Sequence, residues 1–215
     1  MGFKNRRHAA RLLAKRLQAS YKNQHPLVLG VPRGAVPMAK IIADALAGEL
    51  DVVLVHKLSH PQQAELAVGA IDERGIAFVS QWAADVDPAY IEAEKERQLA
   101  ALLERRARYT PLRRSIDPHD RVVIVVDDGI ATGATMIAAL RAIRAYEPKK
   151  LVGAVAVAAA EAAQAMSHEC DEVICLNVPA EFRAVGQFFD DFSQVSDDDV
   201  IAILQQGVEN PSAPA

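Results

Sequence analysis

Short runs of apolar, mostly β-branched residues recur along the chain and constrain its fold more than any other feature. These runs hardly alternate with polar residues, which is typical of strands that are covered on both faces. Helical patterns separate most of them, which indicates parallel βαβ units. We therefore predict an α/β fold with an open, mainly parallel sheet flanked by helices. The runs are PLVLGV (26–31), DVVLVHKL (51–58), RVVIVV (121–126), KLVGAVAV (150–157) and EVICL (172–176).

One region interrupts this alternation and is predicted to be an insertion that forms a lid or hood. Residues 65–80 hold two apolar runs around a DERG turn, the pattern of a β-hairpin. We expect the lid to extend from Leu58 to about Ser80. Asp87 then suits a helix cap and Pro88 the first helical position, so a long polar helix should follow, ending near Tyr109. Its apolar side is expected to carry Ile91, Leu99, Leu102 and Leu103.

The length and composition of the chain favour a single domain. It has 215 residues, of which 51% are hydrophobic, and neither a linker nor a repeat divides it. We expect one domain over 1–215, with its core at about 26–192. A basic, amphipathic helix at about 6–20 should dock at the edge of this core, and a C-terminal helix and tail should occupy 196–215.

Charge and hydropathy argue against several function classes. The formal net charge of −4 argues against a dedicated nucleic-acid binder, although a group of arginines leaves an RNA-binding regulator as an alternative. No apolar run reaches the roughly 18 residues that a membrane span needs. Cys170 and Cys175 show neither a disulfide framework nor metal-ligand spacing, so we expect a cytoplasmic protein with reduced thiols. The arginines in question are at 105, 106, 108, 113 and 114.

Two adjacent carboxylates, Asp127 and Asp128, follow the run RVVIVV without a lysine or arginine close behind them. In an open α/β sheet, the carboxyl ends of the strands border the ligand site. The next loop is rich in small residues and threonine, and leads into a helix beginning near Gly133, whose unpaired N–H groups favour a phosphate. Carboxylates beside such a cradle suit the hydroxyls of ribose 5-phosphate. The alternative is that Asp128 caps a turn and Asp127 pairs with a distant arginine.

The whole segment VVIVVDDGIATGAT (122–135) resembles the phosphoribosyl pyrophosphate signature of type I phosphoribosyltransferases. The order of strands and helices between about 26 and 176 also agrees with that fold. The resemblance implies that Asp127 and Asp128 hold the ribose hydroxyls. It likewise implies that the 5-phosphate binds to Ala131, Thr132, Gly133, Ala134 and Thr135.

The segment GVPRGAVPMA (30–39) occupies the place where this family keeps its pyrophosphate loop. The resemblance implies that the planar fork of Arg33 and the amide of Gly34 meet the pyrophosphate, and that the Pro32–Arg33 peptide is cis. An ordinary β–α turn with an exposed arginine is the alternative. Lys57, after the second predicted strand, is similar to another pyrophosphate-binding position, or it is a lysine that extends into solvent.

Near the C-terminus, FRAVGQFFDDF (182–192) resembles the base-binding hood of purine phosphoribosyltransferases. The resemblance implies that Phe182 and Val185 frame a nucleobase and that Asp190 helps to hold a magnesium ion. The alternative is an aromatic cluster that packs the core. The sequence does not identify a general base, for which Glu65, in the predicted lid, is only a candidate.

These features predict a Mg²⁺-dependent enzyme that transfers ribose 5-phosphate from phosphoribosyl pyrophosphate to a nitrogen acceptor and releases pyrophosphate. Arg33, Asp127 and Asp128 are the expected catalytic residues, and a nucleobase is the expected acceptor. The alternative is a regulatory protein of the same fold that senses phosphoribosyl pyrophosphate or a nucleotide without turnover. Expected partners are these small molecules and a second copy of the chain in a homodimer, with neither a membrane nor a nucleic acid.

Overall fold

The computed structural model describes residues 2–80, 83–111 and 114–206, without the side chains of 64 and 65. The candidate general base Glu65, the arginine at 113 and the expected tail from 207 onward therefore lie outside the described residues. None of the described helices is long and apolar enough to cross a membrane.

A parallel five-stranded sheet forms the centre of the molecule, as the sequence predicts. Its strand order is β2–β1–β6–β7–β8, and every neighbouring pair is parallel. All the carboxyl ends of the strands therefore lie at one edge of the sheet. The strands are β1 (Leu27–Gly30), β2 (Glu49–Val52), β6 (Val122–Ile130), β7 (Lys150–Ala158) and β8 (Glu172–Asn177).

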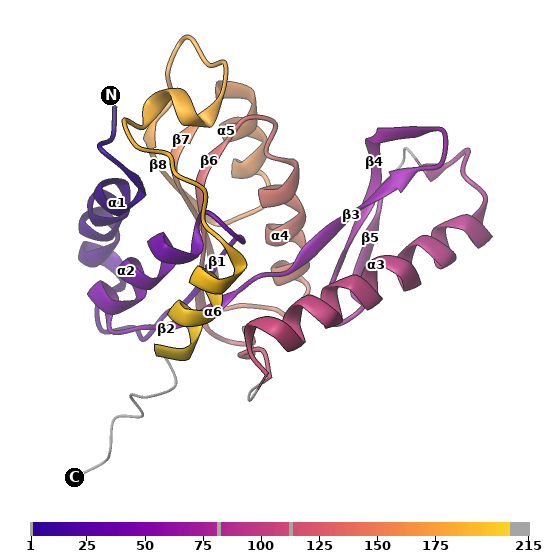
Figure 1. Cartoon of the computed structure of the whole chain (residues 1–215), viewed down its shortest axis with the longest axis horizontal. Coiled ribbons are helices and arrows are strands. Elements are labelled where there is room, and N and C mark those ends of the chain that lie inside the picture. Colours follow the sequence, from indigo (N-terminus) through magenta and orange to yellow (C-terminus); the bar gives the residue numbers. More distant parts are fainter. Residues whose placement is uncertain (1, 81–82, 112–113, 207–215) are drawn as a thin grey trace.

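Helices cover both faces of this sheet, which explains why its strands are apolar on both sides (Figure 1). One face is covered by α1 (Arg6–Tyr21) and α2 (Val36–Leu46), and the other by α4 (Ala134–Arg144) and α5 (Ala160–Ser167). The predicted N-terminal edge helix is thus confirmed.

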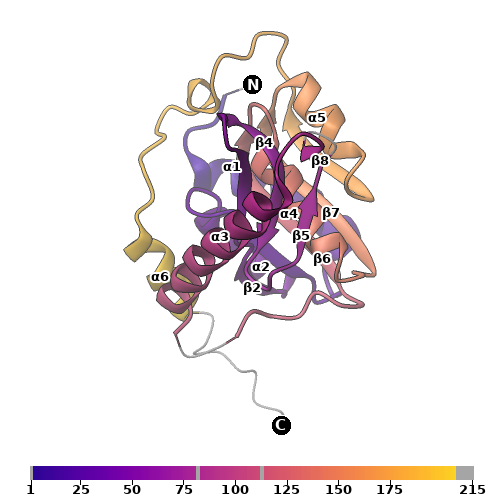
Figure 2. The same ribbon diagram turned by 90° about the vertical axis from the view of Figure 1, so that its right-hand side faces the viewer.

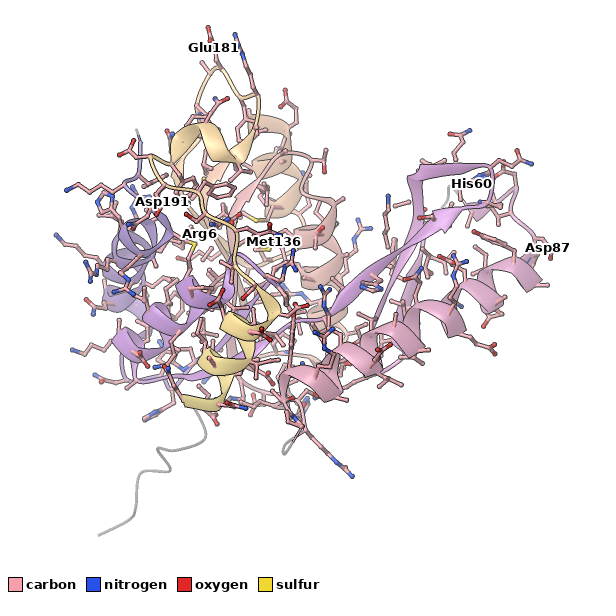
Figure 3. All side chains as sticks on the ribbon, in the orientation of Figure 1. Arg6, His60, Asp87, Met136, Glu181 and Asp191 are labelled. Carbon is pink, nitrogen blue, oxygen red and sulfur yellow. The ribbon has the colours of Figure 1, made fainter. Side chains whose placement is uncertain are left out.

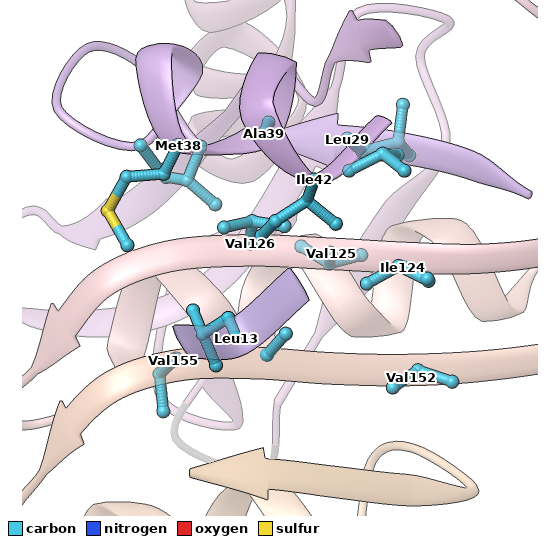
Figure 4. Close-up of a cluster of buried hydrophobic side chains, with 14 of the residues drawn as sticks. Leu13, Leu29, Met38, Ala39, Ile42, Ile124, Val125, Val126, Val152 and Val155 are labelled. Carbon is cyan, nitrogen blue, oxygen red and sulfur yellow. The ribbon is translucent and has the colours of Figure 1, made fainter. Parts of the chain in front are cut away.

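The main hydrophobic core lies between the sheet and these helices (Figure 4). Leu13 of α1 and Ile42 of α2 are fully buried, as are Val126 of β6 and Val155 of β7. This core fixes the strand ends, which is where the candidate site residues lie.

A second, antiparallel sheet of three strands stands beside α4, and the long helix α3 (Pro88–Tyr109) lies across it (Figures 1 and 2). Asp87 caps α3, because its side chain accepts a hydrogen bond of 2.9 Å from the Ala89 N–H. The predicted hairpin and capped helix are therefore confirmed. The strands are β3 (Val55–His60), β4 (Gln63–Asp72) and β5 (Ala77–Val79).

The prediction of a single strand over 51–58 is wrong, because the chain changes sheet within that run. β2 ends at Val52 in the five-stranded sheet, and β3 begins at Val55 in the other sheet. Val53 packs in the main core, whereas Val52 and Leu54 pack in a second core under α3. Both halves of the run are buried, so its hydropathy shows no break.

The second core holds the three-stranded sheet against α3. Val68 and Ile71 of β4 are buried there, with Ile91 and Leu102 of α3. The prediction that Leu103 lies on the apolar side is wrong, since its side chain is 51% exposed. The hairpin is therefore packed on α3 and does not stand alone.

A buried charge network joins this arm, formed by the three-stranded sheet and α3, to the main sheet. The guanidinium of Arg106 in α3 donates a hydrogen bond of 2.8 Å to Asp51 of β2 and one of 2.9 Å to the Val52 carbonyl oxygen. It also pairs with Glu73 in the turn between β4 and β5. One arginine thus links three elements at the base of the arm.

The C-terminal part of the described chain forms a hood and then returns along the body. The hood includes the 3₁₀ helix η2 (Val185–Phe188), and a helix, α6 (Asp197–Gln206), packs against α2 and α3. The expected C-terminal helix is confirmed. Phe3, near the N-terminus, pairs with Phe189 in a parallel bridge, so the start of the chain supports the hood.

Candidate active site

Asp127 and Asp128 lie near the carboxyl end of β6, the central strand of the sheet. The strand continues to Ile130, so the prediction that it stops at the aspartates is wrong. The Asp127 carboxylate accepts a hydrogen bond of 2.8 Å from the Asp128 N–H. Asp127 lines a pocket of about 190 Å³, and residues of the following loop line the same pocket. The two carboxylates are thus placed at the ligand edge of the sheet.

The loop after β6 surrounds the rest of this pocket with small residues. Gly133 has a φ of 75° and caps α4, a left-handed conformation that glycine adopts without steric cost. The Thr132 hydroxyl accepts a hydrogen bond of 3.4 Å from the Ala134 N–H. The positive end of the α4 helix dipole therefore faces the pocket, an arrangement that favours a phosphate. The predicted phosphate residues that line it are Ala131, Thr132, Gly133, Ala134 and Thr135.

The loop after β1 approaches the same carboxylates. Its Pro32–Arg33 peptide is cis, which confirms the expectation from the family resemblance. A Cβ atom added to Gly34 would lie only 2.4 Å from Oδ2 of Asp128. The structure therefore brings together two segments that the sequence separates by more than ninety positions, the candidate pyrophosphate loop and the candidate ribose carboxylates.

Arg33 is partly exposed and lies near the start of α6. A hydrogen bond from Tyr109 and the positive charges of Arg105, Arg108 and Arg33 lower the pKa of Asp197, against the effect of burial. The structure thus places Arg33 beside Asp197, and Arg33 is not among the residues that line the pocket after β6.

Arg6, the first residue of α1, also reaches the aspartates, and sequence reasoning missed it. Its Nε donates a hydrogen bond of 2.7 Å to Oδ2 of Asp128, across 122 positions. Its Nη1 donates another of 2.7 Å to the Ser193 carbonyl oxygen, and its guanidinium lies 3.8 Å from the centre of the Phe192 ring. Figure 3 shows Arg6 below the hood, near Asp191. The alternative reading pairs Asp127 with a distant arginine, whereas in the structure the carboxylate with such a partner is Asp128.

Burial and mutual repulsion make this pair an unfavourable place for two negative charges. Burial raises the pKa of Asp127 well above its ordinary value, and the charge of Asp128 raises it further. Burial also raises the pKa of Asp128, although the hydrogen bond and charge of Arg6 oppose this effect. The pair is suited to a ligand that brings hydroxyl donors or a cation.

The hood contributes Val185 to the pocket. A Cβ atom on Gly129 would meet the Val185 side chain at 2.6 Å, so the hood touches β6. The Phe182 and Phe188 rings lie 5.5 Å apart and pack against the main core, as the alternative of a core cluster proposed. Asp190 is exposed, and its N–H donates to the Phe3 carbonyl oxygen at 2.9 Å.

The placement of Lys57 differs from the sequence prediction. It is an exposed residue within β3, opposite Ala70 in the three-stranded sheet. The other candidates lie at the carboxyl edge of the five-stranded sheet. Lys57 does not follow a strand of that sheet directly, because the chain has already crossed to the arm.

Comparison with known proteins assigns the family. The family model described as "Phosphoribosyl transferase domain" matches residues 4–192. The chain belongs to the phosphoribosyl transferase family. This match includes the hood and both loops, and it supports the expectation of a phosphoribosyltransferase enzyme.

Similar proteins support the same assignment for this phosphoribosyl transferase domain. "Putative phosphoribosyl transferase Rv0571c" and "Putative phosphoribosyl transferase MT0597", from two strains of Mycobacterium tuberculosis, are each 41% identical to it over 207 residues. Those matches cover 95% of this chain and 46% of each relative, so the chain spans about half their length. The crystal structure of TT1426 from Thermus thermophilus has a TM-score of 0.89 and 42% identity, covering 96% of this chain and 99% of that one.

The carboxylates of this phosphoribosyl transferase domain fit a magnesium ion that arrives with a phosphorylated ligand. Mg²⁺ prefers oxygen ligands, and is usually held by one or two carboxylates together with substrate phosphates and water. Among the described residues, no group of three or more His, Cys, Asp or Glu side chains is placed to hold a metal ion. Both aspartates offer such oxygens: Asp127 lines the pocket, and Asp128 lies against the loop after β1.

Proposed function

We propose that the protein transfers the ribose 5-phosphate group of phosphoribosyl pyrophosphate to a nitrogen acceptor. The contact between Gly34 and Asp128 carries this proposal, because it joins the two halves of a donor site. The loop that leads into α4 would hold the 5-phosphate. Asp127 and Asp128 would hold the ribose hydroxyls. Arg33 and the Gly34 amide would hold the pyrophosphate. A donor molecule that spans these groups has its reacting carbon between them.

The reaction would break the bond between ribose C1 and the pyrophosphate oxygen, with the electron pair leaving on pyrophosphate. The acceptor nitrogen then forms a bond to C1 and loses a proton. Positive charge develops on the sugar ring in such a substitution, and the carboxylates of Asp127 and Asp128 stabilise it electrostatically. Arg33 stabilises the departing negative charge with its planar fork. The contribution of the chain is therefore orientation and electrostatics.

We also propose that magnesium is required. Bound with the donor, Mg²⁺ would neutralise part of the negative charge on the pyrophosphate and so make it a better leaving group. Asp127 and Asp128 would hold the metal ion, and the family resemblance adds Asp190, an exposed residue of the hood, as a further carboxylate for it.

A nucleobase is the acceptor that the hood best supports. Val185 borders the pocket directly, whereas the Phe182 and Phe188 rings of the hood pack against the main core. The apolar side chain of Val185 suits a flat heterocycle, since burial of an apolar ring face is favourable. This acceptor class rests on the hood alone.

A turnover screen tests the proposal. Nucleobases and small amines are incubated with phosphoribosyl pyrophosphate, Mg²⁺ and the protein, and released pyrophosphate is measured. We expect release with at least one nitrogen heterocycle and none without an acceptor beyond slow hydrolysis. Binding of phosphoribosyl pyrophosphate without turnover of any acceptor would instead support a sensor. No binding at all would contradict the donor site.

A further inference from the structure

The surroundings of the Arg6 guanidinium differ from those of an ordinary surface cation. Its side chain is only 14% exposed, and Asp128, its partner at 2.7 Å, is 13% exposed. Surface ion pairs usually contribute little, because water screens them and both side chains stay mobile. Here the guanidinium is stacked on the Phe192 ring and donates to two oxygens, so its plane is fixed.

Arg6 also lies against the candidate pyrophosphate loop. A Cβ atom on Gly34 would be 3.1 Å from its Nε and 3.2 Å from its Nη2. One guanidinium therefore borders the ribose carboxylate, the pyrophosphate loop and the hood. Each of these three segments belongs to a different part of the chain.

The main chain on both sides of Arg6 is held in place. Asn5 caps α1 by accepting a hydrogen bond of 2.9 Å from the His8 N–H. Before it, Phe3 donates to the Phe188 carbonyl oxygen at 2.7 Å and packs on the Phe189 ring. After it, Leu13 anchors α1 in the main core. The guanidinium is thus presented from a fixed backbone.

We propose that Arg6 is a positioning residue of the donor site, which orients Asp128 toward the ribose hydroxyls and joins this carboxylate to the hood. A carboxylate can accept about four hydrogen bonds over its two oxygens, so Asp128 can keep Arg6 on Oδ2 while Oδ1 accepts from a hydroxyl. This inference rests on the proposed function. It adds a residue of the N-terminal helix to a site otherwise built from strand ends.

The inference predicts different effects on the binding of the two halves of the donor, ribose 5-phosphate and pyrophosphate. Because Arg6 acts through Asp128, its loss should affect ribose 5-phosphate more than pyrophosphate. A guanidinium bond to a carboxylate belongs to the stronger, charge-assisted class. We expect Arg6→Met to weaken ribose 5-phosphate binding about tenfold or more and to change pyrophosphate binding by less than about threefold.

Arg16 offers a matched control on the same helix. Its guanidinium also donates to a backbone carbonyl, at 2.9 Å, but this partner is Cys175 of the edge strand β8, and the Arg16 side chain is exposed. Arg16→Met removes the same charge from α1 and should leave both affinities unchanged. Arg6→Lys keeps the charge without the planar fork, so it should restore part of the lost affinity.

Calorimetry with the whole 215-residue chain and Mg²⁺ tests the inference, using ribose 5-phosphate and pyrophosphate as separate ligands. A melting curve for each variant establishes that it is folded. Arg6→Ala should regain ribose 5-phosphate affinity when millimolar guanidinium is added, but not with urea, its neutral analogue. This rescue distinguishes a local role in the site from general destabilisation.

Several results would overturn the inference. They are unchanged ribose 5-phosphate affinity in Arg6→Met, equal weakening of both ligands, or an equal effect of Arg16→Met. Failure of the wild-type protein to bind ribose 5-phosphate or phosphoribosyl pyrophosphate would instead overturn the proposed function, and this inference with it. The wild-type measurements thus test the proposed function, and the variant measurements test the role of Arg6.

Discussion

Gly34 and Asp128 approach each other so closely that no side chain fits between them. The Cβ of an alanine at position 34 would lie 2.4 Å from the Asp128 carboxylate, a distance that requires the Asp128 side chain or the loop to shift. The closeness of these residues brings the candidate pyrophosphate loop next to the candidate ribose carboxylates.

Gly34→Ala should therefore weaken donor binding more than it weakens the fold. The added methyl group pushes on Asp128 and on the Arg6 guanidinium next to it. We expect phosphoribosyl pyrophosphate affinity to fall at least about tenfold, measured by calorimetry. Gly2→Ala is the control, because its Cβ would make only an ordinary contact at 3.9 Å. Equal affinities in the two variants would show that the close approach is irrelevant to binding.

Replacing both Asp127 and Asp128 by Asn should abolish most of the donor affinity and leave the fold intact. An amide keeps the size of the side chain but loses charge-assisted hydrogen bonds, each of which contributes about 1.5–3 kcal/mol. Calorimetry should show a loss of about 100-fold or more. Asp44→Asn, which breaks an exposed pair with Lys40, is the control. Unchanged affinity in the double variant would exclude the ribose assignment.

Donor binding should weaken as the pH falls toward mildly acidic values. The pKa of Asp127 is raised well above 3.8 by burial and then by the charge of Asp128, so its carboxyl group takes up a proton at a higher pH than usual. The neutral form is a poorer acceptor, so affinity is lost as the pH falls through the raised pKa. Calorimetry with ribose 5-phosphate from about pH 8 to pH 5 measures this loss.

The ligand phosphate titrates in the same range, so the Asp127→Asn and Asp128→Asn double variant is the control for the pH series. Any pH dependence of the binding affinity that remains in the double variant comes from the ligand phosphate. Identical pH profiles of the wild-type and double-variant proteins would mean that the carboxylates do not titrate during binding.

Arg33→Ala should reduce pyrophosphate affinity by about ten- to a hundredfold and ribose 5-phosphate affinity much less. Its loop follows β1, whereas the phosphate loop follows β6. Arg108→Ala is the matched control, because the charge of Arg108, like that of Arg33, acts on Asp197. Arg108 is a largely exposed residue of α3 that pairs with Asp197 at 3.6 Å. Equal losses of both ligands in Arg33→Ala would show that Arg33 is not specific to pyrophosphate.

The arm should close toward α4 when donor and Mg²⁺ bind. A cleft of about 530 Å³ lies between α4 and the strands β4 and β5, and its lining includes Ala134 of the candidate phosphate loop. Closure would exclude water from a cationic ribose. Hydrogen exchange across residues 58–75 should slow on binding, while β7 serves as the unchanged reference. Equal protection in both states would show that the arm does not move.

A variant of the arm tests its effect on the reaction. Replacing Gln62 to Leu66 with a Gly-Ser linker should raise hydrolysis of phosphoribosyl pyrophosphate relative to transfer. Figure 3 shows His60 and Asp87 at the far end of the arm, away from Arg6 and the hood. A parallel fall of both rates would mean that the segment maintains the shape of the site and does not exclude water.

The parallel sheet and the main site segments could be predicted because their signals are local. A strand covered on both faces is apolar throughout, and a phosphate cradle at a helix start needs small residues in a few consecutive positions. The same locality explains why Asp87 is correctly predicted as a helix cap, because its hydrogen-bond partner, Ala89, is only two positions away. Such features depend on neighbours in the sequence.

Features that depend on distant partners were not accessible to the same reasoning. Val53 lies where the chain leaves one sheet for another, but both sides of the crossing are buried and look alike in hydropathy. The sequence therefore predicts Lys57 at the end of a strand of the main sheet, whereas the residue lies within β3 of the arm. Arg6 has the pattern of a solvated residue on a basic helix, and only folding reveals that its partner is Asp128.

The pairing between α1 and the hood has a consequence for synthesis. Arg6 leaves the ribosome long before its partner Ser193, which lies 187 positions later. Contacts of such separation form late, because the entropy of closing a long loop opposes them until the intervening sheet has folded. The sheet can therefore assemble on a growing chain before the hood has its support. Ligand binding should appear only after the segment around Phe189 has emerged, so a nascent chain would hold a folded sheet for some time before it could hold a ligand.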